Sequence, residues 1–152
     1  MERPFSQPIS ARFFLQTGQA VFADELCLYL KNTALEKHPG GPVPAYYFHI
    51  LRLRDGADMG WLDLRAGESE NTALYGHLSY SLLPQYRGQG YTKKAVSLLL
   101  SLAEKHGLDH LYVCCAEANL ASRGVCRQLG ASFDTFIPMP NGERGMRFRL
   151  DL

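Results

Sequence analysis

The segment from Leu74 to Ala116 constrains the possible folds more than any other part of the chain. Its first ten residues, LYGHLSYSLL, alternate apolar and polar side chains up to Pro84, which predicts a strand. The stretch TKKAVSLLLSLAEKHG, from Thr92 to Gly107, has apolar residues at helical spacing, and the apolar run HLYVCCA predicts a covered strand. A strand, a helix and a second strand in this order form a right-handed crossover whose two strands are parallel.

The flanking segments predict mainly antiparallel strands. ELCLYLKN and the ranges Tyr46–Arg54 and Met59–Ala66 have strand patterns, and the turn DGAD joins the last two. Behind the crossover, NLASRGVCRQLG predicts a helix capped by Asn119, and SFDTFIPM and RGMRFRLDL predict an antiparallel pair around PNGE. We therefore expect one α+β domain over residues 1–152, with a mixed, mostly antiparallel sheet of six to seven strands and helices on both faces.

Three segments are assigned less fully. Residues 1–23 are expected to be an irregular lead-in, in which ARFFLQT could form a short strand. HPGGPVPA, from His38 to Ala45, predicts a loop because glycine and proline interrupt regular structure. GESENT predicts a second, polar loop.

Composition excludes several classes of protein. The net charge of +1 over 152 residues gives no general attraction to nucleic acid or to an anionic membrane. The N-terminus lacks the apolar core of a signal peptide, and no stretch is long and apolar enough to span a membrane. The four cysteines form no CxxC pair, so we expect no metal site and a reduced, cytoplasmic protein. A homodimer is left open.

Glycines precede the predicted helix in the segment Gln85-Tyr86-Arg87-Gly88-Gln89-Gly90. A strand, a glycine turn and a helix N-terminus together can bind an anion, because the first helical N–H groups have no partner within the helix. A tight turn without a ligand is the alternative. The spacing excludes the phosphate motifs GxxxxGK[ST] and GxGxxG.

These residues resemble the signature [RQ]-x-x-G-x-[GA] of the GNAT superfamily of N-acetyltransferases. NLASRGVCRQLGA is similar to the downstream N-x-x-S-x-x-x-x-x-x-L-G-F segment of that superfamily, through Asn119, Ser122, Leu129 and Gly130. Pro84 also stands where the superfamily often closes its fourth strand. The resemblance covers about residues 46–136, and YGHLSYSLLPQYRGQGY is most similar to a branch that includes acetyltransferases of ribosomal-protein N-termini.

The resemblance implies acetyl-coenzyme A (acetyl-CoA) as the cofactor. Backbone N–H groups would hold its pyrophosphate, with Arg87 or Lys93 within reach of a phosphate oxygen, and the pantetheine arm would pair with a free strand edge. Lys93 and Lys94 could equally be a solvated helix start. The expected cofactor-binding residues are Leu82, Leu83, Gln85, Tyr86, Arg87, Gly88, Gln89, Gly90, Tyr91, Thr92, Asn119 and Ser122.

Three residues are candidates for the base that accepts a proton from the amine. His77 is the first, because strand alternation places it with Ser79 and Ser81 on one polar face, although a structural histidine is the alternative. Asp63 is the second, with a surface pair to Arg65 as its alternative. Glu117 is the third.

The chain departs from the superfamily at Ala131, where phenylalanine is usual, and in two further ways. Cys126 stands where a tyrosine usually protonates the departing thiolate, and we expect it to be a buried small residue. Residues 33–44 are too few for the two helices that normally form one wall of the acceptor site. The resemblance therefore implies an N-acetyltransferase acting by direct attack on a primary amine, of a small molecule or a protein N-terminus. A non-catalytic acetyl-CoA-binding module is the alternative.

Overall fold

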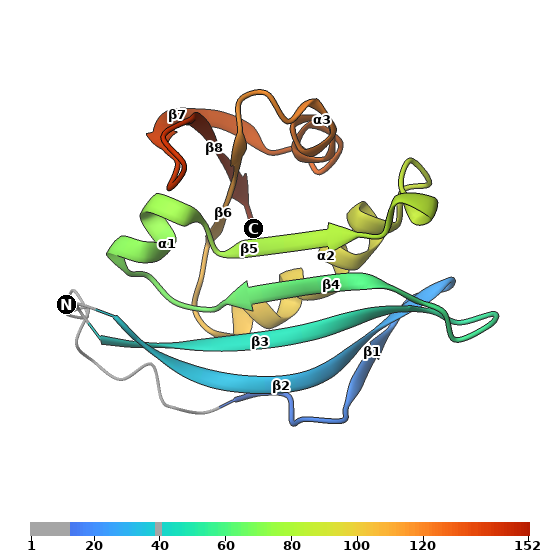
Figure 1. The fold of residues 1–152 in the computed structure, drawn as a ribbon. Coiled ribbons are helices and arrows are strands. Elements are labelled where there is room, and N and C mark those ends of the chain that lie inside the picture. The colour runs from blue at the N-terminus through green and yellow to red at the C-terminus, as the bar shows by residue number, and fades with distance from the viewer. Residues whose placement is uncertain (1–12, 39–40) are drawn as a thin grey trace.

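The computed structural model describes residues 13–38 and 41–152, and Figure 1 shows them as a curved sheet with helices packed against it. The strands are β1 (Ala20–Phe22), β2 (Leu26–His38), β3 (Gly41–Arg52), β4 (Asp58–Arg65), β5 (Leu78–Leu82), β6 (His110–Ala116), β7 (Ser132–Pro138) and β8 (Arg144–Asp151). The helices are α1 (Glu70–Tyr75), α2 (Tyr91–Lys105) and α3 (Leu120–Gln128), and Pro84–Tyr86 form a 3-10 turn.

The described strands form one sheet in the order β1-β2-β3-β4-β5-β6-β8-β7. All neighbouring pairs are antiparallel except β5 and β6, which are parallel and joined through α2. The expected α+β fold with a mixed, mostly antiparallel sheet is confirmed. The sheet has eight strands rather than six to seven, because the lead-in contributes β1, which pairs with β2.

The parallel pair separates almost at once. Leu78 at the start of β5 is paired with Val113, and no later residue of β5 has a partner in β6. On its other side β5 stays paired with β4 along its whole length, from Leu78 to Leu82. The sheet therefore opens between β5 and β6 toward the turn that leads into α2.

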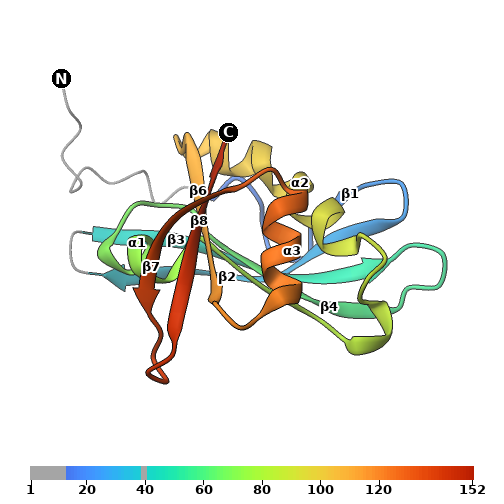
Figure 2. The ribbon, with the colours of Figure 1, turned by 90° about the horizontal axis from the view of Figure 1, so that it is seen from above.

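The core lies between the sheet and α2. Alternate residues of β2, β3 and β4 are fully buried against the inner face of the helix, which Figure 2 shows lying along one side of these strands. The largest of these buried side chains are Tyr46, Phe48, Leu62 and Leu99. On the other side of the strands, Tyr29 and Trp61 are 40% and 43% exposed, so this side is open.

The strand expected from Leu74 begins only at Leu78, because the segment before it forms α1. A capping box starts this helix within the expected loop GESENT: the Thr72 N–H donates to Ser69 Oγ at 3.1 Å, and the Ser69 N–H donates to Thr72 Oγ1 at 2.9 Å. Gly76, with a φ of 91°, then turns the chain into β5.

The expectation of a loop from His38 to Ala45 is wrong at both ends, because β2 extends to His38 and β3 begins at Gly41. The pairing of β2 with β3 continues to the ends of both strands, and Pro44 still accepts a hydrogen bond from the Ala66 N–H. Proline removes only the donor, so a strand position that needs the carbonyl alone can hold it. Positions 39 and 40 lie outside the described residues, as does the start of ARFFLQT, whose remaining residues form no strand.

Candidate functional site

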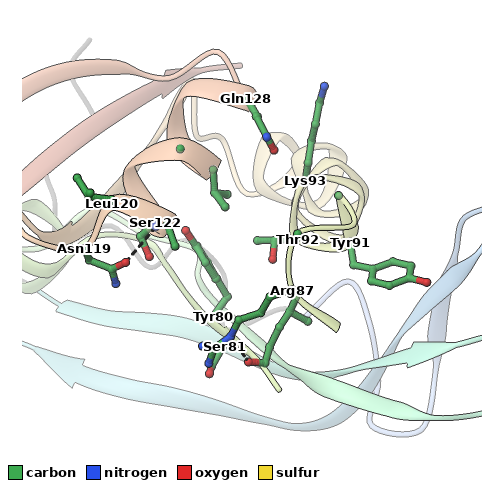
Figure 3. Close-up of a pocket in the computed structure, with 16 residues that line it drawn as sticks. Tyr80, Ser81, Arg87, Tyr91, Thr92, Lys93, Asn119, Leu120, Ser122 and Gln128 are labelled. Carbon is green, nitrogen blue, oxygen red and sulfur yellow. Dashed lines mark hydrogen bonds between the residues drawn. The ribbon is translucent and has the colours of Figure 1, made fainter. Parts of the chain in front are cut away.

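A cavity of about 430 Å³ lies where β5 and β6 separate. β5, the glycine turn, the start of α2 and one side of α3 surround it (Figure 3). Eight of the twelve residues expected to bind the cofactor line it, namely Leu82, Arg87, Gly88, Gly90, Tyr91, Thr92, Asn119 and Ser122. The other four, Leu83, Gln85, Tyr86 and Gln89, do not line it, and Leu83 instead borders a second cavity.

The glycine turn presents open backbone to this cavity. Gly88 and Gly90 have φ angles of 76° and 81°, a region that glycine adopts without strain, and a Cβ at either position would meet no other atom within 4 Å. Gly90 is the N-cap of α2 and provides no side-chain cap. Free N–H groups at the helix start therefore border open space.

The charges around the start of α2 also favour an anion. The first turn has no acidic residue, although acidic residues there would stabilise the helix dipole. Lys93 lines the cavity, whereas Lys94 forms an ion pair with Glu25 at 2.6 Å and belongs to the surface. Arg87 turns back and donates from Nε to the Leu82 carbonyl oxygen at 2.9 Å. This carbonyl lies on the strand edge that β6 leaves unpaired.

Helix α3 and its N-cap form the opposite wall. Asn119 is the N-cap of this helix, as expected, and its Oδ1 accepts from the Ser122 N–H at 3.1 Å. The side-chain NH₂ group of Asn119 is not used by this cap. Ser122, Leu120 and Gln128 of the same helix also line the cavity.

Tyr80 is a lining residue that our sequence reasoning missed. It projects from the middle of β5 toward α3, and its hydroxyl oxygen is buried without a hydrogen-bond partner among the described residues. Burial raises the pKa of Tyr80 to about 12, and the nearby Ser122 hydroxyl partly opposes this shift. The alternation of β5 contained the signal, since Tyr80 shares a face with Leu78 and Leu82.

The structure contradicts the expectation that His77 faces the cleft. The residue precedes β5, its side chain is fully buried, and it does not line the cavity. Its Nδ1 accepts from the Tyr112 N–H at 2.8 Å, and its Nε2 lies 3.5 Å from Glu68. This is the arrangement of the structural alternative, because a fully enclosed ring cannot reach an incoming amine.

Glu117 is also engaged elsewhere. Both of its carboxylate oxygens accept from the Arg144 guanidinium at 2.7 Å, and this pairing lowers the pKa of Glu117. The carboxylate does not line either cavity. It is therefore a poor candidate for a base.

Asp63 lies in a better position than the other two candidates. It lines a second cavity of about 550 Å³ on the open side of the sheet, together with Tyr47, His49, Asp58 and Trp61. Burial raises the pKa of Asp63 to about 6, and the positive charge of Arg65 only partly opposes this shift. The expected alternative, a surface pair with Arg65, is wrong, because Arg65 pairs with Glu36 at 3.0 Å.

The two cavities border neighbouring residues of the paired strands β4 and β5. Ser81 lines the first cavity and is the register partner of Trp61, which lines the second. Asp63 of β4 is the register partner of Ser79, which precedes Ser81 by two residues on β5. A molecule in the first cavity and a molecule on the open face would thus approach each other along β5.

The four cysteines are unpaired. Cys126 is fully buried, as expected, and does not line the first cavity. Interaction with the neighbouring Cys115 thiol, together with burial, raises the pKa of Cys126, so its thiol stays protonated at neutral pH.

Comparison with known proteins shows the family. The profile of the acetyltransferase (GNAT) domain matches residues 10–132, most of the chain. The chain belongs to the GNAT acetyltransferase family. The resemblance of its glycine turn and α3 to this superfamily is therefore confirmed. No curated protein sequence matches the chain.

Several solved GNAT structures share this fold. A RimL ribosomal L7/L12 alpha-N-protein acetyltransferase without ligand has a TM-score of 0.65 and 12% identity, over 88% of this chain and 94% of that one. The ribosomal-protein-S5-alanine acetyltransferase from Vibrio fischeri has a TM-score of 0.59 and 20% identity, over 70% and 61%. The yncA protein from Salmonella typhimurium, solved with its cofactor acetyl-CoA, has a TM-score of 0.58 and 18% identity, over 71% and 65%.

Two features are absent from the described residues. No helix among them is long and apolar enough to cross a membrane. Residues 13–38 and 41–152 contain no cluster of three or more histidine, cysteine, aspartate or glutamate side chains suited to a metal ion.

Proposed function

We propose that this GNAT enzyme transfers an acetyl group from acetyl-CoA to a primary amine of a small molecule or of a protein N-terminus. One observation supports it above all: the first cavity joins an unpaired strand edge to the uncapped start of a 15-residue helix. The helix start suits phosphates, and the strand edge suits a chain that contains amides. Acetyl-CoA would supply the thioester whose acetyl group is transferred.

The residues that line the cavity divide this task. Backbone N–H groups from Gly88 to Thr92 would hold the pyrophosphate, with Lys93 adding positive charge. The strand edge at Leu82 would pair with the pantetheine amides after Arg87 releases the carbonyl that it now occupies. The free NH₂ group of Asn119 would bind an oxygen at the far end.

Asp63 is the proposed base. A carboxyl with a pKa of about 6 is mostly ionised at neutral pH, yet it is basic enough to accept a proton from an amine during attack. The second cavity would receive the acceptor, since Asp58 and Asp63 attract a cationic amine and Trp61 offers an exposed ring. The β2–β3 hairpin borders this cavity through Asn32 and Tyr47, in the region where two helices are usual in the superfamily.

A non-catalytic acetyl-CoA-binding module is the second candidate, and the buried thiol of Cys126 at the usual tyrosine position favours it. An acceptor screen separates the two. Acetyl-CoA and the enzyme are mixed with amines and with peptides that have free N-termini, and the release of the coenzyme thiol is followed. Acceptor-dependent release supports transfer. Calorimetric binding of acetyl-CoA without release by any acceptor supports the module, and the absence of binding contradicts both.

A further inference from the structure

The Tyr80 hydroxyl is a buried polar group that the proposed function leaves without a role. The Tyr80 side chain lines the first cavity, and its oxygen is shielded from solvent. The oxygen makes no hydrogen bond of normal geometry with the described residues, and the Ser122 hydroxyl is the polar side-chain group beside it. An unsatisfied buried hydroxyl lowers stability, and phenylalanine would fill the same space without this cost. A buried hydroxyl of this kind is often explained by a ligand that it binds or by a role in catalysis.

The surroundings of the hydroxyl indicate which ligand atom it would meet. Cys115 of β6 and Cys126 of α3 lie close enough to influence its ionisation, and Ser122 lies beside it. Figure 3 shows the Tyr80 ring reaching from β5 toward Ser122, on the side of the cavity away from Lys93. If the phosphates bind at the start of α2, the opposite, thioester end of the coenzyme reaches this region.

We propose that the Tyr80 hydroxyl donates a hydrogen bond to the sulfur atom of the coenzyme and stabilises the departing thiolate. This inference rests on the proposed function. Tyr80, on the sheet, would supply the donor to the sulfur atom that the buried Cys126 thiol, on α3, does not supply.

The transfer balances without a proton from Tyr80. The amine nitrogen bonds to the acetyl carbon, and the carbon–sulfur bond breaks with its electron pair going to sulfur. The proton lost by nitrogen passes to Asp63 or water, and solvent protonates the thiolate after release. With a pKa raised to about 12 by burial, Tyr80 keeps its proton at neutral pH and acts only as a hydrogen-bond donor.

The test uses the ionisation of bound coenzyme A, which needs no acceptor. The ultraviolet absorbance of its thiolate is titrated from pH 5.5 to 9.5 on wild type and on Tyr80→Phe, with protein in excess. We expect the ionisation constant of the bound thiol to fall about tenfold in the variant, the size of one hydrogen bond to a charged group. Arg87 and Lys93, the charged side chains lining the cavity, are present in both proteins.

Further measurements separate this role from a structural one. Tyr80→Phe should keep the affinity for coenzyme A within about threefold and should melt at the same temperature or higher, because an unsatisfied hydroxyl is removed. Tyr75→Phe, at a 41% exposed tyrosine at the end of α1, is the control and should titrate like wild type. With an acceptor from the screen, kcat of Tyr80→Phe should fall about 10²-fold, as for one lost donor.

The outcomes are distinct. An unchanged thiol ionisation in a Tyr80→Phe protein that binds coenzyme A normally overturns the inference and leaves the proposed function intact. A lower melting temperature with unchanged ionisation shows that the hydroxyl has a structural role instead. If wild type does not bind coenzyme A at all, the proposed function fails and this inference fails with it.

Discussion

At the residue scale, Asp63 shows how position alone can prepare a carboxyl for catalysis. It lies on the open side of the sheet, at the edge of a cavity, yet enough protein surrounds it to disfavour the charged form. The Arg65 guanidinium, which pairs with Glu36 at 3.0 Å, offsets this effect only in part. The raised pKa of Asp63 is thus mainly an effect of burial, and it places the residue in the range useful to a general base.

Asp63→Asn should therefore lower kcat by roughly two to four orders of magnitude, the usual contribution of a positioned base. In wild type, kcat/KM should rise with pH through about 6 as the carboxyl ionises, and the variant should lose this acidic limb. The measurement is a pH profile from 5 to 9 with an acceptor from the screen, alongside calorimetric affinity for acetyl-CoA, which should not change. An acidic limb that survives in Asp63→Asn assigns the base to another group.

Cys126 should be dispensable. Cys126→Ala removes a thiol that is buried and lies outside the first cavity, so kcat should stay within about threefold of wild type. The melting temperature should fall modestly, because a small void replaces the sulfur and lowers the free energy of unfolding by roughly 1 kcal/mol. Turnover lowered a hundredfold at normal stability would instead show that this thiol acts in the reaction.

At the element scale, the strand, glycine turn and helix were predictable because each depends on local chemistry. Glycine at positive φ, helical spacing and an N-cap are short-range features that a sequence displays directly. The assignment of His77 failed for the opposite reason. The alternating pattern predicts one strand that runs through Gly76 and includes His77. In the structure, the capping box of Ser69 and Thr72 starts α1, and Gly76 separates this helix from β5. Ser69 is a common N-cap residue, but Thr72 replaces the glutamate or glutamine of the usual capping-box signature, so the sequence does not display the box directly.

Gly88→Glu should abolish acetyl-CoA binding, because its side chain would enter the cavity in front of the helix start and repel phosphate. Gly142→Glu, in the β7–β8 turn, is the matched control. Both glycines have positive φ angles, 76° and 85°, and open space at the Cβ position, so both variants should lose a similar 1–2 kcal/mol of stability. Calorimetry should show binding in Gly142→Glu alone. Equal affinities in the two folded variants would place the phosphates elsewhere.

At the scale of the whole molecule, the first cavity exists because β5 and β6 separate, while the other strands stay paired and pack against α2. The crossover and the final hairpin were predictable from the order of strands and helices. The second cavity was not, because it combines β2, β3 and β4, and only their register brings Lys31, Tyr47 and Asp63 together. Tyr80 was missed for a related reason, since the space that it lines depends on where α3 packs.

Two groups on the two sides of the sheet should affect the pH dependence of stability with opposite signs. His106 follows α2 and is buried, with its Nε2 2.6 Å from the Tyr46 hydroxyl, and burial lowers its pKa from 6.5 to about 4. As pH falls from 6.5 to 4, the unfolded chain binds a proton that the folded protein does not, so His106 lowers stability. Asp63 does the reverse, since its pKa rises from 3.8 to about 6 and the folded protein binds the extra proton between these values.

The two shifts have opposite signs and are each on the order of 3 kcal/mol, so in wild type they should partly cancel between pH 6 and 4. Variants should separate them. Asp63→Asn should melt above wild type at pH 7 and lose this advantage by pH 4, whereas the melting temperature of His106→Gln should improve relative to wild type as pH falls through the same range. Calorimetric melting from pH 4 to 7.5 provides the measurement. Each difference from wild type isolates one group, because the other titrating groups are common to both proteins. Melting curves that run parallel to wild type across this range would contradict the burial that we assign to these two side chains.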